Sequence, residues 1–159
     1  MTKLRTMIGA TLIATAFGST AFAASPDVYV VKFRADTDAK SQTLDAQLSS
    51  AIAIAGANVE EVTIDTTNAA RWEKSAHTAF DHDIVPVFNK WVGLPGFAAI
   101  VDAKSKRVLG CVNASFDANT MAAEIRKMSK KAAGSAYLSN ASTRVSTQCP
   151  PAFNVDPGQ

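Results

Sequence analysis

The chain has 159 residues, of which 47% are hydrophobic, 8% aromatic and 19% charged, and its formal net charge is +2. This length indicates one domain, large enough to bury a real core. The nearly balanced charge gives no reason to expect a nucleic-acid partner or binding to an anionic membrane surface.

The first 23 residues have the three parts of a secretory signal peptide. Lys3 and Arg5 make the start positive, residues 7–17 are largely apolar, and the motif Ala-Phe-Ala at 21–23 fits the small-x-small cleavage rule. The apolar run is too short for a membrane-spanning helix of about 20 residues. We therefore expect cleavage after residue 23, a periplasmic or secreted location, no membrane span in the mature chain, and equal numbers of acidic and basic residues there.

A strand, a helix and a second strand are expected between residues 27 and 64. Residues 27–34 form a nearly continuous β-branched apolar run, which is typical of a strand buried on both faces. Apolar residues in 38–55 recur at helical spacing, and Gly56 is the expected stop. Residues 59–64 alternate as in a strand, so the three elements predict a right-handed βαβ unit with parallel strands.

Two helices, a hairpin and a last helix are expected next. Asn68 or Thr67 can cap a helix that runs to Phe80, and Pro86 can open a second, short helix. Their large aromatic side chains are predicted to lie in the core or to form a groove wall: Trp72, Phe80, Phe88 and Trp91. After a loop at 92–96, an antiparallel hairpin is expected from strands at 97–101 and 107–112. An amphipathic helix then begins at Asp117 or Asn119 and stops at Gly134.

The C-terminal tail, residues 135–159, is rich in Ser, Asn, Thr and Pro and has no periodicity. The two cysteines of the chain, Cys111 and Cys149, form an even count in a chain that we expect to be exported. We therefore expect a structural disulfide between them, which would tether the tail to the domain formed by residues 24–134.

This order of elements resembles the thioredoxin fold. The run VVKFRAD at 30–36 resembles the strand that leads into the thioredoxin active-site helix, and VTIDTTN at 62–68 resembles its second strand. The segment at 90–112 resembles the region that holds the cis-proline and the hairpin, with Pro95 in the cis-proline position. The resemblance covers residues 27–132 and implies a thioredoxin-like α/β fold, with a four-stranded mixed sheet flanked by helices.

The residues that carry thioredoxin chemistry are absent at the matching positions. Thioredoxins have Cys-x-x-Cys where the first strand meets its helix, and the helix start lowers the thiol pKa there. The matching tetrad in this chain is Asp38-Ala39-Lys40-Ser41, while the buried acid of the family aligns with Lys32 and its tryptophan with Arg34. We therefore expect no dithiol exchange, no catalytic residues and no cofactor at this junction.

What the resemblance still implies is a peptide groove beside Pro95. There the backbone N–H and C=O of Leu94 would pair with an extended segment. The hypothesis is a redox-inactive module that binds a protein or peptide partner in the cell envelope, as a chaperone, adaptor or assembly component. Its candidate groove residues are Arg34, Asp38, Ser41, Leu94 and Pro95. A second interpretation of Asp38 and Ser41 is purely structural, as caps of the helix.

Two other functions stay open. A divergent thiol-disulfide oxidoreductase would use Cys111 and Cys149. A metal-binding protein would use His77, Asp81 and His82, because the first two share one helix face at i, i+4 spacing. Neither set is a complete motif, and the chain has no nucleophile elbow, P-loop or dinucleotide-binding pattern.

Overall fold

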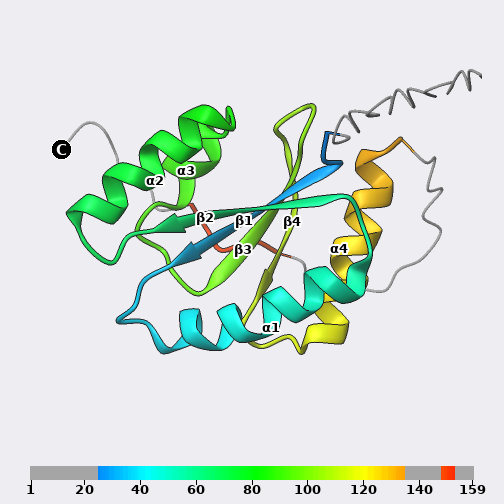
Figure 1. The fold of residues 1–159 in the computed structure, drawn as a ribbon, viewed down its shortest axis with the longest axis horizontal. Helices are drawn as coiled ribbons and strands as arrows, with labels where there is room; N and C mark the ends of the chain where they lie inside the picture. Colours follow the sequence, from blue (N-terminus) through cyan, green and yellow to red (C-terminus); the bar gives the residue numbers. More distant parts are fainter. Residues whose placement is uncertain (1–24, 135–147, 153–159) are drawn as a thin grey trace, which may run out of the picture.

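The computed structural model describes residues 25–134 and 148–152, which form an α/β domain (Figure 1). The elements follow in the order β1 (Val28–Arg34), α1 (Ala39–Ala55), β2 (Val59–Asp65), α2 (Ala69–Asp81), α3 (Val85–Trp91), β3 (Phe97–Asp102), β4 (Val108–Asn113) and α4 (Ala118–Ala132). The predicted signal peptide and most of the tail lie outside the described residues. Within those residues, no helix is long and apolar enough to cross a membrane.

The four strands form one mixed sheet in the order β2-β1-β3-β4. Strand β1 pairs in parallel with β2 and antiparallel with β3, and β3 pairs antiparallel with β4. The predicted parallel βαβ unit and the predicted hairpin are therefore both confirmed. Because β1 and β3 are the central strands, their side chains are covered on both faces, which explains their long apolar runs.

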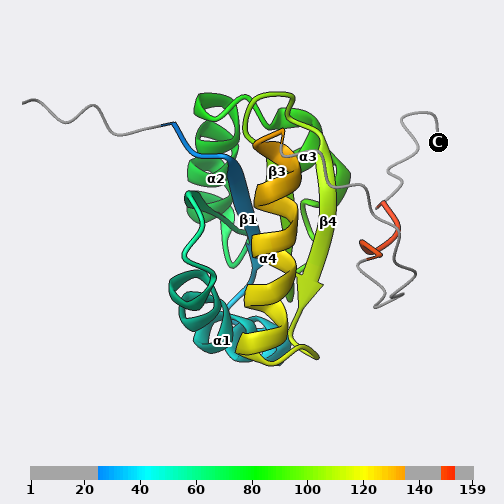
Figure 2. The same ribbon diagram turned by 90° about the vertical axis from the view of Figure 1, so that its right-hand side faces the viewer.

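Helices cover both faces of the sheet and make a three-layer arrangement (Figures 1 and 2). Val28 and Val30 of β1 point to one face, where the core also contains Leu44 and Leu48 of α1 and residues of α4. Val31 and Phe33 point to the other face, which α2 and α3 cover. Since side chains alternate along a strand, Lys32 and Arg34 lie on the α1 side, at the end of β1.

The four aromatic side chains are predicted to lie in the core or in a groove wall, and the core position is wrong for two of them. Phe88 and Trp91 are buried, but Trp72 and Phe80 are 46% and 75% exposed. The physical reason is Ser75, whose hydroxyl accepts from the Asp65 backbone N–H and donates to the Asp65 carbonyl. These two hydrogen bonds turn the face of α2 that carries Ser75 and Ala79 toward β2. Phe80 is the residue after Ala79, about 100° further around the helix, so its side chain points away from the sheet.

The disulfide between Cys111 and Cys149 is confirmed, with 4.9 Å between the two Cα atoms. It joins the edge strand β4 to the short segment 148–152, which is the only described part of the tail. The indole Nε1 of Trp91 donates to the Pro150 carbonyl at 3.0 Å and holds the same segment from the α3 side. The segment is therefore fixed to the domain at two neighbouring points.

Removing this disulfide should destabilise the domain measurably. The two cysteines are 38 residues apart, and closing a loop of that length is worth about 2–4 kcal/mol. The double variant Cys111→Ala/Cys149→Ala should lose about that much free energy of unfolding in urea, and the Trp91 indole N–H should shift in NMR spectra. The reduced wild-type protein is the matched control and should behave like the variant. An unchanged urea midpoint would contradict a stabilising role for the disulfide.

Candidate functional site

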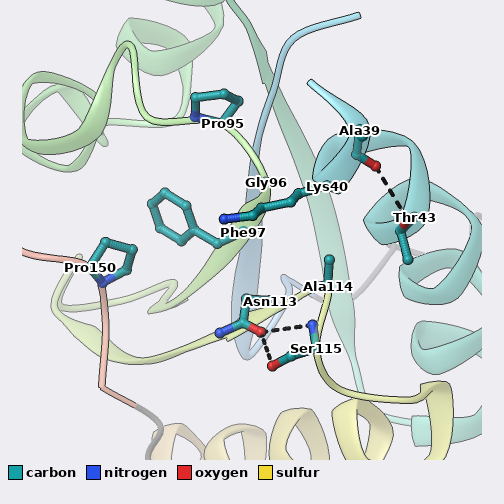
Figure 3. A pocket seen from close by; sticks show the side chains of 10 residues that line it. All are labelled: Ala39, Lys40, Thr43, Pro95, Gly96, Phe97, Asn113, Ala114, Ser115 and Pro150. Atoms are coloured by element: carbon teal, nitrogen blue, oxygen red, sulfur yellow. Dashed lines mark hydrogen bonds between the residues drawn. The ribbon is translucent and has the colours of Figure 1, made fainter. Parts of the chain in front are cut away.

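A pocket of about 630 Å³ opens beside the C-terminal ends of strands β1 and β4 (Figure 3). Four segments surround it: the first turn of α1, the loop before β3, the connection from β4 to α4, and the disulfide-tethered tail segment. Its lining residues are Ala39, Lys40, Thr43, Pro95, Gly96, Phe97, Asn113, Ala114, Ser115 and Pro150. The pocket thus lies at the strand-to-helix junction that the sequence singles out.

Gly96 brings the proline loop into direct contact with α1. Its φ is +90°, and a Cβ at this position would lie 2.8 Å from the Lys40 Cβ and 3.0 Å from the Asp38 Oδ2. Its N–H donates to the Phe33 carbonyl at 2.9 Å, which pins the loop to the end of β1. A side chain would be strained in this conformation and would push the loop away from the helix. This contact sets the width of the pocket on the side of Pro95.

Asp38 is the N-cap of α1, and its side chain is hydrogen-bonded to Ser41. The Asp38 carboxylate accepts from the backbone N–H and the hydroxyl of Ser41, both at 2.8 Å. The Ser41 hydroxyl also accepts from the backbone N–H of Ala35 at 3.2 Å, and its side chain is fully buried. The structural interpretation of this pair as helix caps is therefore confirmed, and Ser41 has no surface on which a ligand could bind.

Lys32 and Arg34 belong to an ion network that fixes the end of β1 to its neighbours. The Lys32 ammonium lies 3.0 Å from Asp45 on α1 and 2.7 Å from Glu61 on β2. The Arg34 guanidinium binds three carboxylates, those of Asp36, Asp45 and Asp65. Both side chains are less than one-fifth exposed, so their charges are compensated within the fold rather than by solvent.

These contacts shift the pKa values of the groups involved. Burial lowers the pKa of Lys32, but hydrogen bonds to Glu61 and Asp45 raise it above its usual value overall. Burial raises the pKa of Asp65, but hydrogen bonds from Thr67 and the guanidinium of Arg34 outweigh it and lower this pKa to about 2. The directions of these two pKa shifts favour the charged forms of Lys32 and Asp65, whose ion pairs hold the end of β1 to its neighbours.

The structure separates the five predicted groove residues. Pro95 lines the pocket, whereas Arg34, Asp38 and Ser41 are engaged in the network and in the helix cap. The backbone N–H of Leu94 donates to the Trp91 carbonyl at 2.9 Å, so it is not free to pair with a peptide. The described part of the chain has no cis peptide bond, and the bond before Pro95 is trans.

Among the described residues, no group of three potential metal ligands occurs around the histidines or elsewhere. His77 is exposed on α2, while the two ring nitrogens of His82 lie 2.8 Å from the Thr78 carbonyl and 2.9 Å from a Glu60 carboxylate oxygen. Burial lowers the pKa of His82, but these two acceptors raise it above its usual value. When His82 is protonated, both ring nitrogens donate to these acceptors and no lone pair is left for a metal ion.

The pocket residues that sequence reasoning missed lie far apart along the chain. Asn113, Ala114 and Ser115 lie where β4 ends, and their place near the α1 junction could have been predicted from the expected topology. Strand β4 points in the same direction as β1, so the two strands end on the same side of the domain. Pro150 allows no such prediction, because its position depends on the disulfide and on Trp91.

Comparison of the chain with protein-family models, with curated proteins and with solved structures found no match in any of the three.

The substitution Asp65→Asn tests the ion network through its dependence on pH. The native pKa of about 2 lies below the ordinary value of 3.8, so the charged carboxylate stabilises the fold above pH 3.8 and this contribution is lost as the pH falls toward 2. We expect the variant to lose roughly 1–3 kcal/mol of unfolding free energy at pH 7. The difference from wild type should shrink steadily in urea titrations between pH 4 and pH 2.

The matched control is Glu73→Gln, at an exposed position of α2. This change should leave the unfolding free energy within about 0.5 kcal/mol of wild type. A difference between Asp65→Asn and wild type that stays constant down to pH 2 would contradict the assignment of the low pKa to Asp65.

Proposed function

We propose that the chain is an exported, thioredoxin-like protein that binds a peptide segment of a partner protein and carries out no dithiol chemistry. The strand order β2-β1-β3-β4, with one parallel pair and a hairpin, supports this fold assignment. The signal-like segment at 1–23 supports export. Within the cell envelope, the protein would act as a chaperone, an adaptor or a component of an assembly.

The observation that carries the proposal is the position of the pocket. It lies between the start of α1 and the loop of Pro95, which is where the resemblance places a peptide groove. At the same junction, the two positions that would hold cysteines form the Asp38–Ser41 cap. The scaffold therefore keeps an accessible surface at a site whose reactive pair is replaced by a helix cap.

The size and lining of the pocket suit a ligand of this kind. Its volume of about 630 Å³ falls within the range of about 300–1,000 Å³ typical of binding sites. Apolar surfaces from Pro95, Ala114 and Pro150 surround a small number of polar groups. Such a mixture favours a peptide side chain that is partly apolar, with a few directional polar contacts.

Assays of disulfide exchange separate this function from that of an oxidoreductase. Exchange needs an accessible thiolate, whereas Cys111 is 4% exposed and bonded to Cys149. We expect the purified protein to leave the rate of insulin reduction by dithiothreitol unchanged. The Cys111→Ala/Cys149→Ala variant is the control. Turnover by wild type that this variant lacks would instead support an oxidoreductase that uses the two cysteines.

Selection from a displayed library of random twelve-residue peptides tests binding at the pocket. We expect wild type to enrich a related group of sequences, and the variant Thr43→Trp to lose them at least tenfold, because the indole would fill the pocket. Thr43 is exposed on α1, so the change should leave the core intact.

The matched control is Ser50→Trp, which places the same side chain at an exposed position about two turns further along α1. This variant should retain wild-type enrichment. Peptides that bind wild type and Thr43→Trp equally well would contradict the assignment of binding to this pocket.

A further inference from the structure

The pocket presents the ammonium group of Lys40 without a neighbouring carboxylate. In the part of the chain that the structure describes, no acidic group lies within ion-pair distance of this nitrogen. The Cβ of Lys40 lies against Gly96, and its side chain extends from α1 across the pocket toward Phe97 (Figure 3). The Cβ end of the Lys40 side chain is therefore held against Gly96, and its ammonium group faces the space that a ligand would occupy.

Asn113 presents a second donor at the same pocket. Its Oδ1 accepts from the backbone N–H of Ser115 at 2.9 Å and also from the Ser115 hydroxyl. These two bonds use both lone pairs of the oxygen and fix the orientation of the amide. The Nδ2 group points away from Ser115 toward Pro150 (Figure 3), and it has no acceptor among the described residues.

The carboxylates of Asp38 and Asp36, at the start of α1 and in the loop before it, form hydrogen bonds or ion pairs with other groups. Asp38 binds the N–H and hydroxyl of Ser41, and Asp36 binds Arg34 and Arg71. The hydroxyl of Thr43, which also lines the pocket, donates to the Ala39 carbonyl at 3.2 Å. The pocket therefore presents several donors, and Lys40 is the one charged residue among those that line it.

We propose that this pocket takes an acidic side chain from an extended segment of the partner protein. The carboxylate would accept from the Lys40 ammonium and from the Asn113 Nδ2, since hydrogen bonds between charged groups are among the strongest available at such a site. The residue next to the acid would pack against Pro95 and Pro150. This inference rests on the peptide-binding function proposed above and adds the chemistry of the ligand.

The test repeats the selection from the random twelve-residue library with charge variants of the pocket. Wild-type protein should enrich Asp and Glu at one peptide position at least threefold over the starting library. Lys40→Gln, which keeps the Cβ that contacts Gly96, should abolish this enrichment. Lys40→Glu should reverse it toward Lys and Arg, and Asn113→Asp, which replaces a donor by an acceptor, should weaken it.

Lys130→Glu is the matched control, because it makes the same charge change at an exposed position of α4. Its selected peptides should match those of wild type. Far-UV circular dichroism and a urea midpoint for each variant establish that all of them fold.

The outcomes distinguish the inference from the function on which it rests. If wild type selects neutral peptides that Thr43→Trp loses, the pocket binds peptides but the acidic preference is overturned. If Lys40→Glu selects the same acidic peptides as wild type, the acid binds elsewhere and the inference is likewise overturned. If no selected sequence depends on Thr43, both the inference and the peptide-binding function are wrong.

Discussion

The contact between Gly96 and the first turn of α1 is the constraint on which the site depends. Gly96 donates to the Phe33 carbonyl at the end of β1, and the absence of a side chain lets the loop approach Lys40 and Asp38. Three elements meet at this point, and their relative positions define one side of the pocket. On the opposite side, Pro150 is held by the disulfide and by Trp91. The tail segment is thus part of the site as well as part of the stabilising framework.

Ion pairs organise the junction between β1 and α1. Lys32 and Arg34 bind carboxylates from α1, β2 and the end of β1, so they join these elements where a buried acid and a tryptophan are expected by resemblance. Breaking such a pair leaves a partly buried charge without a partner, which makes the network costly to disrupt one residue at a time. Together with the Asp38–Ser41 cap, the network gives the junction a rigid structural role, and the open pocket beside it supports our proposal of binding.

Much of the fold could be predicted from the sequence, because it depends on local signals. The apolar run of β1, the spacing in α1 and the caps at Asp38 and Gly56 each act within a few residues. The positions of Trp72 and Phe80 could not be predicted in this way, since hydrogen bonds from Ser75 to another element decide which face of α2 is buried. The pocket depends still more on tertiary structure. Pro95 was identified by resemblance, but Lys40, Asn113 and Pro150 come together only when α1, β4 and the tail are in place.

The central claim is that a ligand peptide binds between α1, the loop of Pro95 and the end of β4. Isotope-filtered NMR spectra of labelled protein with a peptide from the library selection would measure its contacts directly. We expect intermolecular contacts to Lys40, Thr43 and Asn113. The exposed aromatic residues Trp72 and Phe80 of α2 offer the alternative surface, and contacts to them in place of the pocket residues would contradict the claim.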